Sequence, residues 1–237
     1  MTELVFRNDA YAKSCDAIVT HVDERGIQLD RSVFYPTGGG QPGDIGMLRS
    51  SAGDISIAGT IKGGADEAPD TVIHVPVANG RMPAVGETVI AEIDWMRRHR
   101  LMRFHTSMHL LCSIVPGAVT GGSIGEDKAR LDFDVATDSL DREAIESRLS
   151  ALVAGAHPVT SRWIADDEMA ARPELVRTMS VKPPTGQGRV RLLDIEGVDL
   201  QPCGGTHVQN TSEIGRVVIT KIENKGKQNR RIIIGLQ

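Results

Sequence analysis

The chain has 237 residues, which is long enough for one large domain or two modest ones, each with its own hydrophobic core. Its hydrophobic content of 40% and charged content of 24% are typical of soluble globular proteins, and no apolar run reaches the length that spans a bilayer. The formal net charge of −4 excludes a polycation, so any binding of nucleic acid would depend on local basic patches.

The first ninety or so residues predict short strands separated by glycine-rich turns. Val, Ile and Thr are frequent, and polarity often alternates, in the segments 16–22, 26–35, 54–62, 71–77 and 87–94. Clusters of Gly, Pro, Asn and Asp lie between these segments and favour turns. Short strands at this spacing are typical of small barrels and sandwiches. We therefore expect an N-terminal β-barrel or sandwich without helices.

Two observations bear on where the protein works. The N-terminus lacks the charged and apolar regions of a secretory signal peptide, so we expect a cytoplasmic protein. The cysteines, Cys15, Cys112 and Cys203, are too few in a chain of this size to form a disulfide framework. A disulfide is therefore not the expected role of Cys203.

The composition changes at Asp94, where a long helix is predicted. Residues 94–115 contain neither Gly nor Pro, and Asp94 can cap the helix N-terminus. Several residues fall largely on one face of this helix, namely Leu101, His105, Met108, His109, Leu111 and Cys112.

A second helix is predicted within 138–156, where apolar residues repeat at helical spacing. Strand-like segments follow at 157–165, 189–197, 213–224 and 230–236. This part of the chain therefore predicts an α+β domain in which helices pack on an antiparallel sheet. We expect two domains, 1–94 and 95–237.

Two pairs of residues predict a metal site. His105 and His109 are four residues apart on one helix face, a spacing that suits two ligands of one ion. Taken alone, such a pair is more often two ordinary histidines, although burial of both on an apolar face would need a compensating interaction. Cys203 and His207 form the second pair, within "QPCGGTH". Together the pairs make a Cys-His₃ set, which suits tetrahedral Zn²⁺.

Other roles for these residues stay open. Cys203 could be a nucleophile with His207 or a helix histidine as its base, but two histidines would then have no role. Cys112 could be a ligand, although a small buried hydrophobe is its more common role. Metalloprotease chemistry is disfavoured, because Thr106 and Met108 stand where H-E-x-x-H and its inverted form need glutamate.

Several motifs resemble those of a known family. "RLMRFHTSMHLL", "RLDF" and "DLQPCGGTHVQNTSEIG", followed by "KIENKGKQNRRIIIGL", are similar to the editing domain shared by alanyl- and threonyl-tRNA synthetases. "FYPTGGGQPGDIG" at 34–46 resembles the glycine-rich signature of alanyl-tRNA synthetase and its free-standing relatives. Over nearly its entire length the chain resembles the medium-length alanyl-tRNA editing proteins of the AlaX type.

The resemblance implies a translation-factor-like β-barrel followed by an α+β editing domain. It implies hydrolysis of serine, and often glycine, wrongly attached to alanine tRNA. Zn²⁺ would be the cofactor, with His105, His109, Cys203 and His207 as its ligands. No P-loop is present and the chain has no room for an aminoacylation domain, so we expect no use of ATP and no aminoacylation.

The glycine-rich loop would help to shape the aminoacyl pocket, with Thr37 near the serine hydroxyl. Thr37 would thus join His105, His109 and Cys203 as a catalytic residue, and its neighbours Gly38, Gly39, Gly40 and Gln41 would contact substrate. An alternative is a tight turn that needs positive φ, with Thr37 as its cap. A catalytic Gln41, by analogy with the GGQ tripeptide of release factors, has weak support.

Two basic clusters predict contacts with tRNA, although charged runs are more often solvated faces. The first comprises Arg97, Arg98, Arg100 and Arg103, and the second Lys221, Lys225, Lys227, Arg230 and Arg231. If they contact phosphates, binding should weaken steeply with salt.

Three functions are compared. The first is a zinc-dependent deacylase of Ser-tRNA(Ala), in which the metal orients the aminoacyl group and water, since no carboxylate stands out as a base. The second is threonyl-type editing, which the glycine-rich signature disfavours. The third is a tRNA-binding module in which zinc is purely structural, as four protein ligands would allow.

Overall fold

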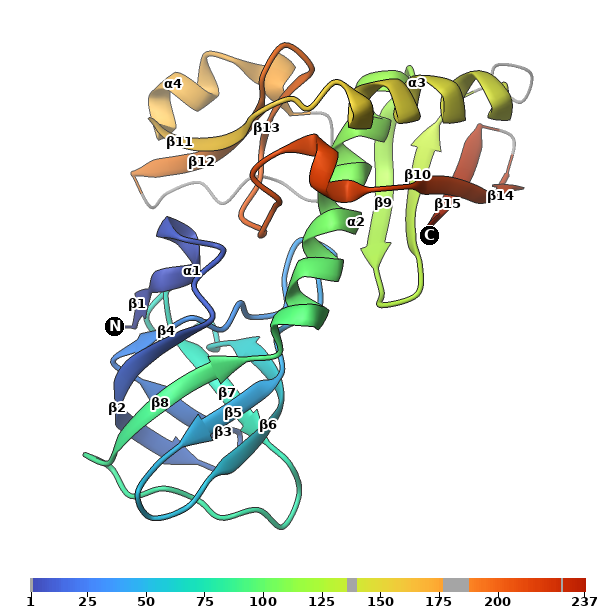
Figure 1. Cartoon of the computed structure of the whole chain (residues 1–237). Coiled ribbons are helices and arrows are strands. Elements are labelled where there is room, and N and C mark those ends of the chain that lie inside the picture. Colours follow the sequence, from blue (N-terminus) through green and yellow to red (C-terminus); the bar gives the residue numbers. More distant parts are fainter. Residues whose placement is uncertain (1, 136–139, 177–187, 227) are drawn as a thin grey trace. The chain divides into compact units, whose positions relative to one another are not determined.

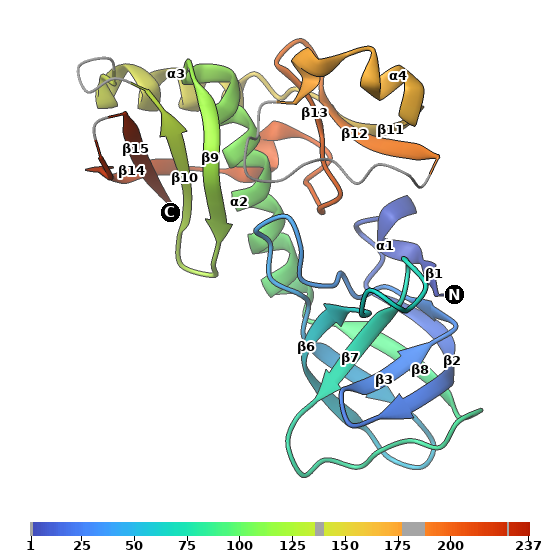
Figure 2. The same ribbon diagram turned by 180° about the vertical axis from the view of Figure 1, so that it is seen from behind.

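The computed structural model describes residues 2–135, 140–176, 188–226 and 228–237. Backbone contacts divide the chain into two compact units, Met1–His99 and Arg100–Gln237. Figures 1 and 2 show the elements of both units from opposite sides. Among the described residues, no helix combines the length and apolarity that crossing a membrane requires.

The first unit is built on a closed antiparallel barrel with the strand order β2-β3-β7-β6-β5-β8 (Figure 1). Its strands are β2 Ser14–Asp23, β3 Gly26–Leu29, β5 Gly46–Arg49, β6 Ile55–Lys62, β7 Val72–Pro76 and β8 Thr88–Ile93. The short strands β1 Glu3–Leu4 and β4 Arg31–Ser32 form a parallel pair beside it. The predicted β-barrel is therefore confirmed.

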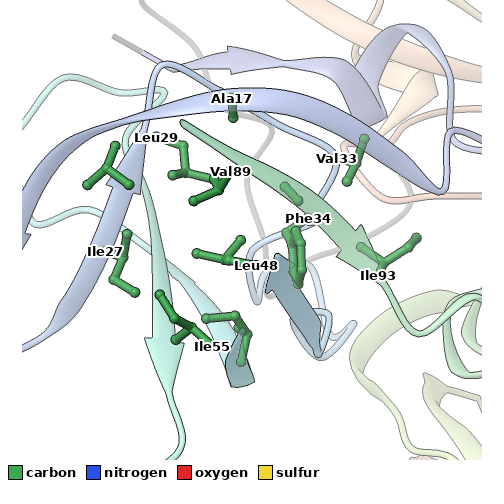
Figure 3. Close-up of a cluster of buried hydrophobic side chains, with 12 residues drawn as sticks. Ala17, Ile27, Leu29, Val33, Phe34, Leu48, Ile55, Val89 and Ile93 are labelled. Carbon is green, nitrogen blue, oxygen red and sulfur yellow. The ribbon is translucent and has the colours of Figure 1, made fainter. Parts of the chain in front are cut away.

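Alternating side chains fill the barrel (Figure 3). In β8, Val89, Ala91 and Ile93 are buried while the residues between them are more exposed. They pack with other buried side chains, including Leu48 of β5 and Phe34, which follows β4. A period of two is what a strand with one face in a core requires, and each large apolar side chain buried this way stabilises the fold by about 1.5–3 kcal/mol.

One prediction for this unit is wrong, because it contains the helix α1 Val5–Asn8. The helix is a single turn, too short to show helical periodicity in the sequence. Its buried Phe6 packs edge-on against Tyr35, with ring centroids 5.4 Å apart. A contact between distant residues therefore stabilises a helix that local sequence does not predict.

The second unit is α+β, as predicted, and contains two antiparallel sheets. One has the order β14-β15-β10-β9, with strands Val217–Asn224, Asn229–Leu236, Ala129–Asp134 and Ala118–Ile124. The other has the order β11-β12-β13, with strands Val159–Ala165, Arg189–Ile195 and Asp199–Pro202. Besides most of the long helix α2 Trp95–Ile114, the described part of the unit contains the helices α3 Arg142–Ala154 and α4 Asp166–Ala170 and the 3₁₀ turns η2 Pro173–Leu175 and η3 Thr211–Ile214.

The long helix α2, Trp95–Ile114, begins where it is predicted, because the Asp94 carboxylate accepts a hydrogen bond of 3.0 Å from the Arg97 backbone N–H. The prediction of a single buried face is too narrow, since every residue from 101 to 112 except Arg103 is buried. Polar residues are accommodated in this environment because Thr106 and Ser107 donate their hydroxyl protons to backbone carbonyls one turn earlier.

Candidate metal centre

Four side chains from separate segments meet in the second unit. His105 and His109 lie on α2, while Cys203 and His207 lie on the glycine-containing loop that follows β13. Their ligand atoms all lie within 4.8 Å of one another. The Cys203 Sγ is 3.6 Å from His105 Nε2 and 3.2 Å from His207 Nε2. The four residues that the sequence predicts as ligands thus form one cluster.

A buried carboxylate fixes the orientation of one imidazole. His109 Nδ1 is 3.0 Å from Asp199 Oδ2, and since an ionised carboxylate can only accept, Nδ1 carries the proton. Gln201 Nε2 donates to both Asp199 oxygens at 2.8 Å. His109 Nε2 is therefore the nitrogen that is left to bind a ligand in the cluster.

A hydroxyl fixes a second imidazole. Thr106 Oγ1 donates to the Met102 carbonyl at 3.0 Å, so it can only accept from His207 Nδ1, which is 3.2 Å away. His207 Nε2 is thereby directed toward Cys203. Thr106, the residue that excludes the metalloprotease motif, thus orients a histidine of the cluster.

The charges in the cluster favour a thiolate. Burial raises the pKa of Cys203, but the neighbouring His105 and His207 more than offset this and hold that pKa well below its usual value. Burial lowers the pKa of His109, whereas hydrogen bonds to Asp199 and Cys203 raise it, to about 10 overall. Burial also holds the pKa of His207 well below its ordinary value. The Cys203 thiolate and the neutral His207 imidazole are the forms that bind a metal, whereas His109, which is protonated without the metal, would release its Nε2 proton on binding an ion.

The cluster fits a metal ion. One thiolate and three imidazoles are a donor set that binds metals in tetrahedral geometry, and two of the rings are already held with Nε2 toward the centre. A buried set of this kind needs a compensating charge, which a divalent cation supplies. These residues could therefore hold a metal ion.

Arg191 on β12 holds the loop that carries two of the four residues. Its Nη1 donates to the Cys203 carbonyl at 2.9 Å and to the Gly205 carbonyl at 3.1 Å. In return the Cys203 backbone N–H donates to the Arg191 carbonyl at 3.0 Å. These bonds fix the backbone on both sides of Gly204.

The glycine-rich loop lies in the first unit and forms a tight turn. Gly38 and Gln41 exchange two backbone hydrogen bonds of 3.0 Å, and Gly39 and Gly40 between them have φ of 58° and 82°. Two successive positive φ angles explain the glycines. The Gln41 side chain is buried, so the prediction that it contacts substrate is corrected.

Thr37 is exposed at the base of this turn, and its hydroxyl has two partners. Thr37 Oγ1 donates to the Thr60 carbonyl at 3.2 Å and accepts from the Gly43 N–H at 2.8 Å. The turn-capping interpretation therefore describes its contacts. Because a hydroxyl has two lone pairs, one acceptor position is left in addition to these bonds.

The first basic cluster is partly structural. Arg98 is fully buried and forms an ion pair with the buried Asp44, and it also donates to the Val33 carbonyl at 2.7 Å. The prediction that Arg98 contacts tRNA is therefore wrong, because its charge is neutralised inside the protein. Its neighbour Arg97 is half-buried and donates to the Gly43 carbonyl at 2.8 Å.

The second basic cluster also differs from its prediction. Arg230 is buried and donates to the carbonyls of Gly226 and Asn229, so its predicted contact with tRNA is corrected. Arg231 makes a two-pronged ion pair with Asp132, at 2.7 and 2.8 Å. Further ion pairs join Glu223 to Lys221 and Lys225. Lys227 lies outside the described residues.

Four contributors to the site were missed in the sequence, namely Thr106, Arg191, Asp199 and Gln201. A local signal existed for two of them, because Asp199, Gln201 and Cys203 alternate along β13 and its extension and therefore share a face. His105, His109, Cys203 and His207 all belong to the second unit, whereas Thr37 and the glycine-rich loop belong to the first.

Two family descriptions match the chain. Residues 190–233 match the threonyl and alanyl tRNA synthetase second additional domain. Residues 6–97 match the class II (A) tRNA synthetases. The first match includes Cys203 and His207, and the second includes the whole glycine-rich loop.

Individual proteins match over almost the entire chain. The alanyl-tRNA editing protein AlaX-M of Methanosarcina barkeri is 36% identical, over 100% of this chain and 99% of that protein. AlaX-M of Saccharolobus solfataricus is 33% identical, over 98% of each chain. The alanine–tRNA ligase of Pyrobaculum neutrophilum is 33% identical over 94% of this chain but only 25% of its own length. The similarity thus covers both compact units.

Proposed function

Because the chain belongs to the alanyl-tRNA editing proteins, we propose that it is a zinc-dependent deacylase that removes serine from Ser-tRNA(Ala) in trans. The observation that carries this proposal is the buried Cys-His₃ cluster, whose lowered thiol pKa and fixed imidazoles suit Zn²⁺. The activity belongs in the cytoplasm, where tRNA is charged.

His105, His109, Cys203 and His207 would hold the ion. Bound there, Zn²⁺ would orient the aminoacyl group and the attacking water. Asp199 and Thr106 keep two ligand imidazoles in the required tautomer. Asp199 itself accepts two bonds from Gln201 and one from His109, which argues against a role as the general base.

Thr37 is the proposed contact of the serine hydroxyl. Its own proton is donated to Thr60, so it would accept a hydrogen bond from the substrate rather than donate one. Alanine has no hydroxyl to donate, and a site built for that bond disfavours it. Gly38, Gly39 and Gly40 would contact the aminoacyl end, and Arg97, Lys225 and Arg231 remain proposed tRNA contacts.

The test is deacylation of Ser-tRNA(Ala) by purified protein of measured zinc content, beside Ala-tRNA(Ala), Gly-tRNA(Ala) and Ser-tRNA(Ser). We expect rapid release of serine from Ser-tRNA(Ala). Release of glycine from Gly-tRNA(Ala) is also compatible with the proposal, whereas Ala-tRNA(Ala) and Ser-tRNA(Ser) should stay intact. Cys203→Ala should lose both zinc and activity. Cys112→Ala, which removes a buried thiol of α2 outside the cluster, should keep both. A Thr37→Val variant should lose discrimination against Ala-tRNA(Ala).

Full activity in zinc-free Cys203→Ala would overturn zinc dependence. Stoichiometric zinc and tight tRNA binding without deacylation would instead support the alternative function, a tRNA-binding module with structural zinc. That alternative is favoured by the number of protein ligands, since four fill a tetrahedral site.

A further inference from the structure

An aromatic ring and a guanidinium group form an exposed pair on the three-stranded sheet. The β11–β12 register places Trp163 opposite Arg191 and Ala165 opposite Arg189, so the two arginines and the indole project from the same face. The Arg189 Cζ lies 4.5 Å from the centroid of the Trp163 ring. Trp163 is 39% exposed, which is unusual for so large an apolar side chain.

The same face leads to the metal centre. The β12–β13 register places Leu193 opposite Gln201, and both are buried. Arg191, directly across from Trp163, donates to the carbonyls of Cys203 and Gly205. A continuous path of contacts thus runs from the exposed indole to the loop that carries two metal ligands.

The opposite face of this sheet has a different role. Ile164, Val190 and Leu192 on that face pack with Met169 of α4 and Leu175 of η2 in a small hydrophobic core. Figures 1 and 2 both show α4 lying against the sheet. Trp163 is therefore not needed for this core, although its neighbour Ile164 is.

The chemistry of the pair matches a nucleobase. Every base has an aromatic face that stacks on an indole, and a planar guanidinium stacks on bases and attracts the adjacent phosphates. Aromatic residues are only 3% of this chain, and it has just two tryptophans. The substrate's ester is carried by the unpaired 3′ end of tRNA, whose bases are free to stack.

We propose that Trp163 and Arg189 form a binding site for a nucleobase in the single-stranded 3′ end of tRNA. The proposal rests on the proposed deacylase function, because that function brings this end of the tRNA to the metal loop. The base stacks on the Trp163 indole. The Arg189 guanidinium lies beside the stacked rings and offsets the negative charge of the adjacent phosphate. The site thereby holds the 3′ end beside Cys203 without reading its sequence.

Fluorescence provides a direct test. A Trp95→Phe substitution leaves Trp163 as the sole indole, and phenylalanine preserves the packing of position 95 against the barrel core. In this background the trinucleotide CCA should quench the fluorescence saturably. Adding Arg189→Ala should weaken CCA binding on the order of tenfold, since one stacked contact contributes about 1–3 kcal/mol. No quenching by CCA at any concentration up to the millimolar range would overturn the proposal.

Kinetics provide an independent test. Trp163→Ala should raise KM for Ser-tRNA(Ala) on the order of tenfold at nearly constant kcat and unchanged zinc content, and Trp163→Phe should restore most of the loss. Arg162→Ala is the matched control, because Arg162 lies on the same strand but pairs with Leu192 on the opposite face. Its KM should equal that of the wild type.

The outcomes separate the two proposals. If the wild type deacylates Ser-tRNA(Ala) and Trp163→Ala has the same KM, the nucleobase site is wrong and the deacylase function stands. If the wild type does not deacylate but CCA quenches Trp163, the deacylase function is wrong and a nucleobase site remains.

Discussion

At the scale of single residues, the contact between Asp199 and His109 gives the sharpest prediction. Asp199→Asn keeps the shape of the side chain but removes the charge that holds the Nδ1 proton of His109. We expect zinc affinity to fall by roughly 10–100-fold, the usual effect of losing such a partner. Competition with a chelator measures the affinity. Asp194→Asn, on the neighbouring strand β12 and partly exposed, is the control and should bind zinc normally. Equal affinity in the two variants would show that Asp199 does not position His109.

The same contact shows how far single residues can be predicted. The cluster of His105, His109, Cys203 and His207 could be predicted because cysteine and histidine at helical and loop spacings have a specific chemistry. Asp199 and Thr106 could not, because their roles depend on partners that are 90 and 101 positions away. The role of Arg191 could not be predicted either, since its side chain bonds to backbone carbonyls, which every residue has.

At the scale of elements, the buried pair Arg98–Asp44 joins the first turn of α2 to the glycine-rich segment. Asp44 also accepts from the Tyr35 N–H, so the pair anchors the base of the loop. Arg98→Met leaves the Asp44 charge buried without its partner, and we expect the free energy of unfolding to fall by about 3–5 kcal/mol. Urea denaturation measures this change.

The neighbouring arginine is the control for that experiment. Arg97→Met removes one hydrogen bond to a carbonyl from a half-buried side chain, so the expected loss is only about 1 kcal/mol. A double variant with Arg98→Met and Asp44→Asn should regain part of the lost stability, because no unpaired charge remains. Unchanged stability in Arg98→Met would contradict the structural role of the pair.

Elements differ in how well the sequence predicts them. The bounds of α2 follow from Asp94 and Pro116, which act locally on the backbone. By contrast, Arg98 looks like one of a row of surface charges in the local sequence. Its buried role cannot be predicted there, because its partner Asp44 is 54 positions away. The strand β9, with two glycines in "AVTGGSI", has little strand propensity of its own and forms through pairing with β10.

At the scale of the whole molecule, alternation of polarity predicts a barrel and the mixed pattern predicts an α+β unit. Neither pattern predicts that the strands of the second unit divide into two sheets. β10 pairs with β15, joining Leu131 to Ile232, whereas the intervening strands β11, β12 and β13 form a sheet of their own. Such pairings are decided by packing between distant segments rather than by local preference.

The free energy of unfolding of the barrel should depend on pH, because the strand β7 carries a fully buried histidine, His74. His74 Nδ1 donates to the Ile27 carbonyl at 2.9 Å, and Nε2 accepts from the Ser32 hydroxyl at 2.7 Å, so the neutral ring is satisfied. Burial lowers the pKa of His74 to about 4. In the unfolded chain a histidine titrates near pH ~6.5. Between these values the unfolded state takes up a proton that the folded state does not. The free energy of unfolding should therefore fall as pH decreases from about 6.5 to about 4, by about 3 kcal/mol from this residue.

Urea denaturation of the wild type and His74→Gln across this range isolates the contribution of His74. The difference between the two should shrink as pH falls. A constant difference between wild type and His74→Gln would show that His74 accepts a proton in the folded barrel as readily as in the unfolded chain.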